Sequence, residues 1–291
     1  MSQIGHATYV GPKWETGDAP LKTFNDEGVL ETLVSYIANS KELWTEQSNA
    51  MKKMTGMKMP YDLTAYEGGP SGYFLPGQGD ADAVKATEHY GKSLAMGVAA
   101  LDGWLDATKL GWTYQNFLGY GQGEYWASHT TMGNGFRPSP GWLTLKMRNR
   151  FGVGEMIAAD VNGPAFDRKK GDKTTTLPLI GSYAFRDGDK YGVFVLSRKI
   201  NGIVEGVDFG DGSTATTLKL PFESAKKITL LKLTGDPRAT NVDNYNIKLQ
   251  SQDIPISALV NKSLSINRKS GGAEGGMPMG SIFLYIFEDA F

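Results

Sequence analysis

The sequence contains no cysteine and only three histidines among its 291 residues. Without cysteine there are no disulfides, no thiolate nucleophiles and no zinc–thiolate sites. The three histidines (His6, His89 and His129) are too few for a multi-histidine metal site, so we expect neither a metal nor another cofactor. A cysteine-free chain suits the cytosol as well as the cell exterior, which leaves the localisation open.

Long apolar runs and an excess of one charge are also missing. The hydrophobic runs are far shorter than the roughly 20 residues of a membrane helix. The net charge of −1 gives no electrostatic reason to expect nucleic acid or a membrane surface as a partner. The first residues, MSQIGHATYV, have neither the basic nor the apolar region of a signal peptide. If a parent enzyme is secreted or periplasmic, we expect its signal outside this sequence.

Glycine and aromatic residues are plentiful, with 37 Gly, 13 Tyr, 13 Phe and 6 Trp. Many of the aromatic residues stand in short loops beside carboxamides and carboxylates. Such rings can stack on the apolar faces of sugars, or they can fill a β-rich core. Composition alone leaves both interpretations open.

The first 150 residues alternate strand-like with helical segments. The expected strands are 4–10, 63–66 and 113–119, and the expected helices are 29–44, 81–107 and 140–150. This β-α-β-α-β-α order, with long loops after the strands, is typical of a parallel α/β architecture. We predict a partial (β/α)8 barrel of about three β/α units in a domain of residues 1–150. Its open sheet edge would need cover from a partner chain, a homo-oligomer or a further segment.

After residue 150 the pattern changes to short strands separated by turn residues. The expected strands are 156–161, 177–185, 191–197, 217–222, 228–233, 245–250 and 281–287. The last of these is apolar on both faces, so we expect it to be central. Asp187-Gly188 and Asp211-Gly212 are hairpin-type dipeptides. We predict an antiparallel β-sandwich over residues 151–291, which makes the fold class α/β plus all-β.

One segment carries the clearest chemical signal, Leu63-Thr64-Ala65-Tyr66-Glu67-Gly68-Gly69-Pro70. A carboxylate stands at the end of an expected strand, with an aromatic residue before it. The two glycines after it allow a sharp turn and the close approach of a ligand. An ionised carboxylate in this place could attack an anomeric carbon. The alternative is a strand-end glutamate that accepts bonds from loop amides.

This segment resembles the strand-7 nucleophile motif of the clan A (β/α)8 glycoside hydrolases, which include arabinofuranosidases and xylosidases. The order of elements is also similar: Tyr66–Gly69, the 81–107 helix, Phe117–Trp126, a helix containing Gly141–Lys146, and strands after 150. The family has strand 7, a helix, strand 8, a last helix and a carboxy-terminal β-sandwich in that order. The resemblance implies a retaining glycosidase that acts on an oligo- or polysaccharide, with Glu67 as its catalytic nucleophile.

The resemblance also implies roles for other residues. Tyr9, on the strand equated with strand 6, matches a tyrosine that hydrogen-bonds the nucleophile. The expected substrate-binding residues are His6, Tyr9, Trp14, Tyr66, Tyr120, Glu124 and Trp126. Ordinary packing is an open alternative for His6 and for Trp112.

The sequence departs from the family in one respect. Retaining hydrolysis needs two carboxyl groups about 5–5.5 Å apart. In clan A the proton donor follows strand 4, usually in an Asn-Glu pair, and no such pair occurs in this sequence. We expect the acid/base carboxylate to be missing from this chain, with Glu124 as a weak replacement, so that activity requires a complementing amino-terminal chain. The alternatives are a non-catalytic carbohydrate-binding or structural protein derived from a hydrolase, or a truncated reading frame.

Overall fold

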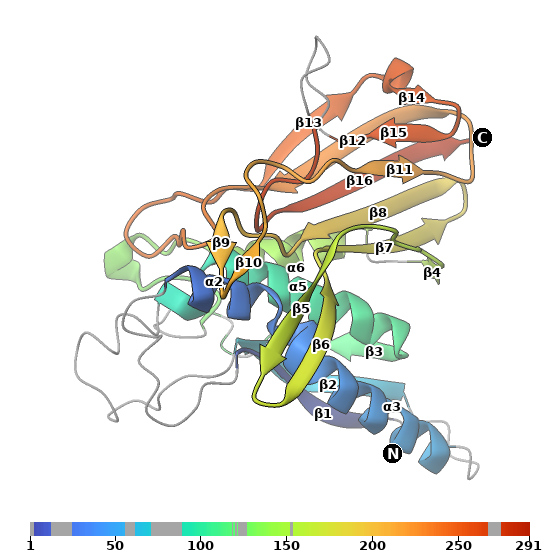
Figure 1. The fold of residues 1–291 in the computed structure, drawn as a ribbon. Helices are drawn as coiled ribbons and strands as arrows, with labels where there is room; N and C mark the ends of the chain where they lie inside the picture. The colour runs from blue at the N-terminus through green and yellow to red at the C-terminus, as the bar shows by residue number, and fades with distance from the viewer. Residues whose placement is uncertain are drawn as a thin grey trace. The chain divides into compact units, whose positions relative to one another are not determined.

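The computed structural model describes residues 3–12, 25–55, 62–70, 89–117, 119, 121, 127–151, 154–266 and 275–291. The chain forms two compact units (Figure 1). The first unit comprises Met1–Thr144 and Arg238–Asn246, and the second comprises Leu145–Pro237 and Ile247–Phe291. In the part of the chain that is described, no helix is both long enough and apolar enough to cross a membrane.

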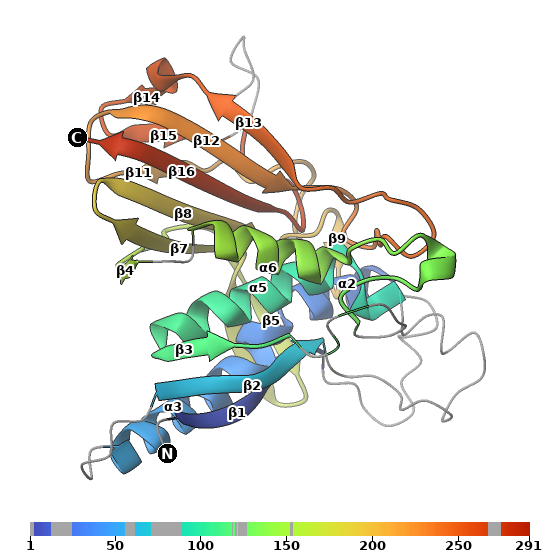
Figure 2. The same ribbon diagram turned by 180° about the vertical axis from the view of Figure 1, so that it is seen from behind.

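The first unit contains a three-stranded sheet in the order β1-β2-β3. Its strands are β1 (Gln3–Val10), β2 (Asp62–Pro70) and β3 (Trp112–Gln115). Both pairings are parallel, as the alternation of strands and helices predicts. Figure 2 shows the three strands side by side, with helix α5 (Leu94–Lys109) running along one face. The predicted parallel arrangement is therefore confirmed for these strands.

The helix expected over residues 29–44 is in fact three consecutive helical segments. These are α2 (Asp26–Leu33), the π-helical turn η1 (Tyr36–Ser40) and α3 (Lys41–Thr55). Asn25 caps α2, because its side chain accepts a 2.9 Å bond from the Gly28 amide. The π turn lies where Tyr36 turns into the core. There its hydroxyl donates to Asp106 Oδ2 on α5 at 2.5 Å, so η1 and α5 are joined by a buried polar bond.

The expected 81–107 helix agrees only in part. Residues 81–88 lie outside the described residues, and the helix from residue 89 is interrupted before α5 begins. Ser93 caps α5 by accepting a 3.1 Å bond from the Met96 amide. The last helix, α6 (Pro140–Phe151), agrees with the helix expected over 140–150 and has proline at its first position.

The two faces of the parallel sheet differ. One face carries a buried apolar cluster of strand and helix residues: Val10, Tyr36, Trp44, Leu63, Ala65, Ala99, Ala107 and Trp112. On the opposite face Tyr66 and Tyr114 are 59% and 58% exposed. Parallel sheets are normally covered on both faces. Within the described residues, helices cover only one face of this sheet.

The second unit is built from antiparallel strands, as predicted. Its largest sheet has the order β13-β12-β16-β8-β7-β4, and a three-stranded sheet has the order β11-β15-β14. The strands of the large sheet are β4 (Glu155–Ile157), β7 (Ile180–Asp187), β8 (Lys190–Ser197), β12 (Ala225–Leu233), β13 (Gln250–Ile254) and β16 (Ile282–Ala290). Those of the smaller sheet are β11 (Thr217–Lys219), β14 (Leu259–Val260) and β15 (Ser263–Ser265). A common apolar cluster includes residues of both sheets. The expectation of a central last strand is confirmed, because β16 pairs with both β12 and β8.

Several details of the second unit differ from the expectation. The strand predicted over 177–185 is two strands, β6 (Lys173–Pro178) and β7, because β6 pairs instead with the unexpected strand β5 (Ala165–Lys170). The strand predicted over 245–250 is wrong except for its last residue, where β13 begins.

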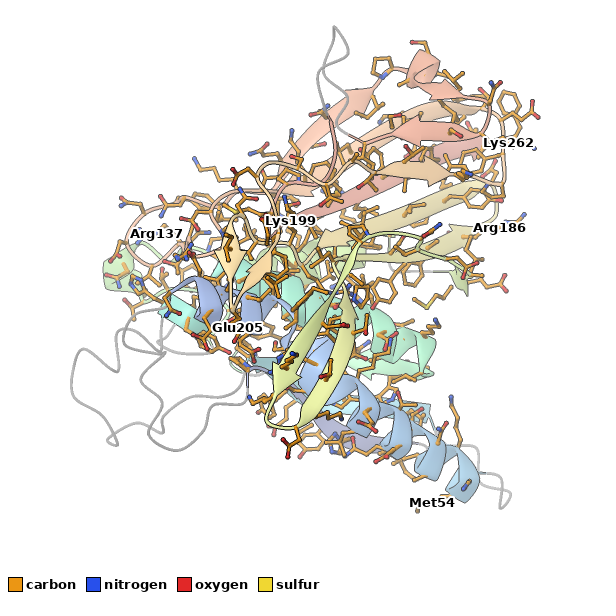
Figure 3. The ribbon with its side chains drawn as sticks, in the orientation of Figure 1. Met54, Arg137, Arg186, Lys199, Glu205 and Lys262 are labelled. Carbon is orange, nitrogen blue, oxygen red and sulfur yellow. The ribbon has the colours of Figure 1, made fainter. Side chains whose placement is uncertain are left out.

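The two expected hairpin dipeptides have different outcomes. Asp187-Gly188 does join β7 to β8, with Gly188 at a φ of 62°. Asp211-Gly212 lies in an irregular loop instead. The neighbouring hairpin of β9 (Ile203–Val204) and β10 (Val207–Asp208) turns at Glu205-Gly206 (Figure 3).

The segment Arg238–Asn246 lies between β12 and β13 in the sequence, yet it packs as part of the first unit. We call it the strap. Its Ala239 carbonyl accepts a 2.9 Å bond from the Leu94 amide, and its Arg238 pairs with Asp26. No sequence pattern indicates this placement. The predicted division into domains of residues 1–150 and 151–291 stays a prediction.

The Tyr36–Asp106 bond gives a test of the layer behind the sheet. Tyr36→Phe leaves the buried Asp106 with Lys41, whose Nζ is 3.5 Å from Oδ2. A lost bond to a charged group costs about 2 kcal/mol, so we expect the free energy of unfolding to fall by that amount. All six tryptophans lie within residues 1–144, so denaturation followed by tryptophan fluorescence reports this unit selectively. As a control, Tyr114→Phe at an exposed position should change the free energy of unfolding by less than about 0.5 kcal/mol.

Candidate active site at the end of strand β2

Strand β2 contains one extra residue beside the candidate nucleophile. In the register with β1, His6 pairs with Ala65 and Ala7 pairs with Glu67, so Tyr66 has no partner. A bulge of this kind re-aims the side chains that follow it. Ala65 belongs to the helix-covered cluster. Both Tyr66 and Glu67 therefore lie on the open face of the sheet.

Tyr9 lies on the same face, two residues beyond Ala7 on β1, and its phenol meets the Glu67 carboxylate. The pKa of Tyr9 is raised to about 12, mainly because burial disfavours the phenolate. The negative charge of Glu67 and a hydrogen bond to its carboxylate raise this pKa further, and Tyr66 adds a smaller effect. At neutral pH Tyr9 is thus a neutral donor and Glu67 its acceptor. This bond fixes the orientation of the carboxylate.

The backbone around Glu67 is closely packed. A Cβ at Gly68 would lie 2.4 Å from Thr8 Oγ1 and 2.6 Å from the Thr8 carbonyl oxygen, so only glycine permits this approach of the strands. Gly69 has a φ of 136°, a conformation that other residues rarely adopt. The Thr8 hydroxyl donates to the Glu67 carbonyl at 3.4 Å. The two glycines thus hold Glu67 at a defined place on the strand end.

His6 is not brought to this group. Its Nε2 is 2.8 Å from Nε2 of Gln47 on α3, and its ring lies edge-on to Trp112 with centroids 6.0 Å apart. These contacts lie on the helix-covered face, opposite Glu67. Of the two interpretations of His6, the contacts support packing. Trp112 is likewise a buried member of the helix-covered cluster.

Four of the predicted substrate-binding residues lie outside the described residues: Trp14, Tyr120, Glu124 and Trp126. Their assignments stay predictions. Of the predicted residues that are described, the structure brings together Tyr9, Tyr66 and Glu67. Among the described residues no group of three or more His, Asp or Glu side chains is placed to hold a metal ion.

The structure adds residues that the sequence did not single out. Tyr114 pairs with Thr64 and is exposed on the open face. Asn116, just after β3, forms two hydrogen bonds with β2. Its backbone N–H donates to the Ala65 carbonyl at 3.1 Å, and its side-chain amide donates to the Tyr66 carbonyl at 3.4 Å. Asn116 therefore supports the bulge from the other side. Its position within the expected strand 113–119 was the available signal.

Comparison with known proteins gives matches among solved structures only; no family model and no curated protein matches this sequence. The GH51 arabinofuranosidase from Xanthomonas axonopodis pv. citri has a TM-score of 0.69 at 15% identity. A second arabinofuranosidase has a TM-score of 0.63 at 13% identity. The family 51 alpha-L-arabinofuranosidase AbfB from Bifidobacterium longum has a TM-score of 0.62 at 13% identity.

Each match covers 99% of this chain and 53% of the other chain. This chain thus spans about half the length of these structural neighbours. Their architecture is a TIM barrel followed by a β-sandwich. At this identity the likeness shows the fold alone, and the structures that share it include GH51 arabinofuranosidases.

The Tyr9–Glu67 contact can be tested by NMR titration of tyrosine ¹³Cζ signals, with Tyr9 assigned through Tyr9→Phe. We expect a midpoint of about 12 for Tyr9. In Glu67→Gln the charge is gone while burial, the largest cause, remains, so the midpoint should fall part of the way towards 10. Tyrosines remote from Glu67 should keep their midpoints. An unchanged Tyr9 midpoint in Glu67→Gln would show that the phenol does not meet the carboxylate.

Proposed function

We propose that this chain carries the nucleophile half of a retaining glycosidase, with Glu67 as the catalytic nucleophile. The observation that carries the proposal is the placement of Glu67. It stands at the carboxyl end of a parallel strand, on the open face of the sheet, and accepts a bond from a tyrosine that stays neutral. Active sites of (β/α)8 enzymes lie at this end of the strands. The neighbours of the same fold are named as arabinofuranosidases.

The chemistry follows from this geometry. Glu67 attacks the anomeric carbon, the bond to the leaving oxygen breaks, and a glycosyl ester forms on the carboxylate. Water then attacks the same carbon, gives its proton to a second carboxyl group that acts as a base, and releases Glu67 as a carboxylate. The Tyr9 hydrogen bond holds the attacking oxygen in place for the first step. Because its phenol stays protonated, it can donate throughout the reaction and stabilise the carboxylate again when it is released.

The proton for the leaving oxygen must come from a second carboxyl group. We assign it to residues outside these 291, either in a partner polypeptide or in a longer form of the protein. The sequence has no Asn-Glu pair of the family type, and the chain matches about half the length of its structural neighbours. In this proposal β1, β2 and β3 are part of a (β/α)8 barrel, and the missing strands would cover their open face. The substrate would be an oligo- or polysaccharide.

A second candidate function is carbohydrate binding without hydrolysis. It is favoured by the two exposed rings on the open face, Tyr66 and Tyr114, which can stack on sugars without any acid/base group. In this case Glu67 would only accept hydrogen bonds from sugar hydroxyls.

The test is hydrolysis of 4-nitrophenyl glycosides, including the α-L-arabinofuranoside, by the chain mixed with the amino-terminal half of a GH51 enzyme. We expect release of nitrophenol in the mixture. Glu67→Ala should reduce the rate by at least about 10³-fold, because the covalent route is removed. Added azide should partly restore release of nitrophenol by attacking the anomeric carbon in place of the carboxylate.

A matched control is Glu46→Ala, which removes an exposed carboxylate from α3, on the helix-covered side. It should leave the rate of the mixture unchanged. Hydrolysis that persists in Glu67→Ala would rule out the nucleophile assignment. Sugar binding that needs neither Glu67 nor the added half would favour the non-catalytic function.

A further inference from the structure

The loop that precedes α6 presents an aromatic stack to solvent. Phe136 lies on His129 with ring centroids 4.5 Å apart and an angle of 10° between the planes. Trp142 also packs against His129, with ring centroids 5.7 Å apart and the planes tilted by 52°. One face of the Phe136 ring is thus covered, while the residue as a whole is 49% exposed. A flat apolar surface therefore remains open to a ligand.

The backbone under this ring is strained. Phe136 has a φ of 48°, directly after Gly135 at 80°. A bulky residue in the left-handed region is unusual, and such conformations persist only where the surroundings enforce them. They are concentrated at ligand clamps and active sites. Replacing Phe136 with asparagine, which adopts this region readily, would relieve the strain, yet the chain has phenylalanine here.

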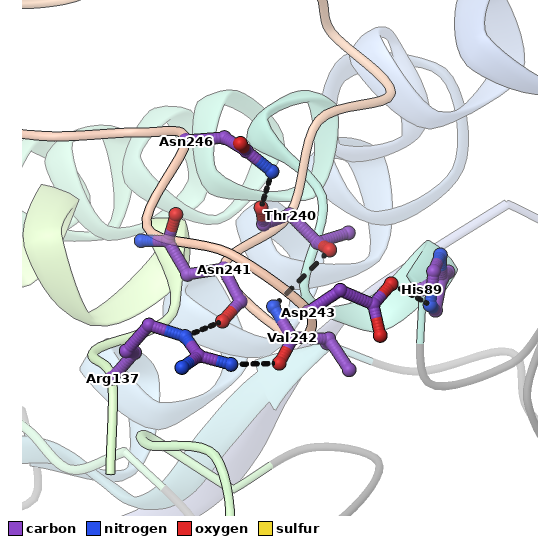
Figure 4. A network of polar contacts seen from close by, with 7 residues as sticks. All are labelled: His89, Arg137, Thr240, Asn241, Val242, Asp243 and Asn246. Atoms are coloured by element: carbon purple, nitrogen blue, oxygen red, sulfur yellow. Dashed lines mark hydrogen bonds and ion pairs between the residues drawn. The ribbon is translucent and has the colours of Figure 1, made fainter. Parts of the chain in front are cut away.

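Hydrogen bonds with the strap hold this loop in its strained conformation. Arg137 Nε donates to the Asn241 carbonyl at 2.7 Å, and its guanidinium also donates to the Val242 carbonyl (Figure 4). Asn241 returns a 2.8 Å bond from its side-chain amide to the Pro138 carbonyl. Within the loop, the Arg137 amide donates to Thr130 Oγ1 at 2.7 Å. The stack is therefore held in one conformation before any ligand arrives, which lowers the entropic cost of binding.

The orientation of His129 is also fixed. Ser128 Oγ is 2.8 Å from Nδ1 and 3.0 Å from the Gly121 carbonyl oxygen, to which it donates. Nδ1 is thus engaged with Ser128, which leaves Nε2 as the ring nitrogen for a ligand. Nε2 can form a hydrogen bond with a hydroxyl at the edge of the stack.

The stack is connected to the end of β2 through packed rings. The Phe117 ring is 3.8 Å from the Cβ position of Gly69, two residues after Glu67. Phe117 in turn meets Trp142 edge-on, with centroids 6.1 Å apart. Both the loop and Glu67 follow the carboxyl ends of parallel strands, so they belong to the same edge of the sheet.

We infer that Phe136 and His129 form a sugar-binding subsite, distinct from the Glu67 site, which holds a further ring of an oligosaccharide chain. The ligand class rests on the proposed function, whereas the platform itself rests on the geometry of this loop. A sugar ring would lie with its apolar face on Phe136, and one of its hydroxyls would form a hydrogen bond with His129 Nε2. This combination of a flat ring and a fixed polar group suits a pyranose or furanose better than a purely apolar ligand.

The experiment measures binding of soluble arabinoxylan and of xylo-oligosaccharides by calorimetry and by tryptophan fluorescence, since Trp142 is part of the stack. Phe136→Asn removes the ring but suits a φ of 48°, so the fold should be kept or stabilised. We expect its affinity to fall about tenfold or more. Phe136→Tyr keeps the ring and should bind within about threefold of the wild type. Phe291→Asn removes another exposed ring, in the second unit, and should have no effect.

The outcomes separate this subsite from the proposed function. If Phe136→Asn folds with an unchanged or higher unfolding midpoint and still binds as the wild type does, the subsite is wrong. Absence of binding to these probes in the wild type would also overturn it. Glu67→Gln should retain most of the affinity while abolishing hydrolysis in the complemented mixture. Loss of the Phe136 effect with hydrolysis intact would leave the nucleophile proposal standing alone.

Discussion

The single extra residue in β2 is the constraint on which the candidate site depends. Without the bulge at Tyr66, strict alternation would place Glu67 on the same face as Ala65, in the apolar cluster under the helices. With it, the carboxylate reaches the open face, where the Tyr9 phenol donates to it. Gly68 makes this register possible, because any side chain there would collide with the Thr8 carbonyl. The position of the charge is therefore a property of backbone pairing as much as of the side chain.

The two faces of the parallel sheet in the first unit differ, and the difference suits a ligand-binding site. The covered face is held by stacked rings and by the buried Tyr36–Asp106 bond, so the strands have a rigid support. The open face carries two exposed tyrosines, Tyr66 and Tyr114, whose rings are not needed for the packing of the apolar cluster. The strap fixes the loop that follows β3, and it links a late part of the chain to the carboxyl edge of the sheet. A preorganised site needs a rigid support behind it and side chains that face the ligand, and the two faces of this sheet provide these.

Much of this could be read from the sequence, and the exceptions have physical reasons. The parallel strands and the central β16 follow from local periodicity, which a sequence shows directly. The likeness to clan A hydrolases led to Tyr9 and Glu67, and the structure places them in contact. The Tyr66 bulge, the π turn at Tyr36 and the strap were not predictable, because each depends on pairing between residues far apart in sequence. His6 was grouped with Glu67 by position on β1, yet it faces α3 because alternation puts it on the covered side.

The most direct test of the central claim is to locate a covalent adduct. The chain, alone and with a complementing half, would be incubated with 2,4-dinitrophenyl 2-deoxy-2-fluoroglycosides, whose leaving group departs without a proton donor. Peptide mass mapping would then identify the modified residue. We expect a glycosyl ester on Glu67 that is absent from Glu67→Gln and unaffected by Glu46→Ala. An adduct on another carboxylate, with Glu67 unmodified, would contradict it.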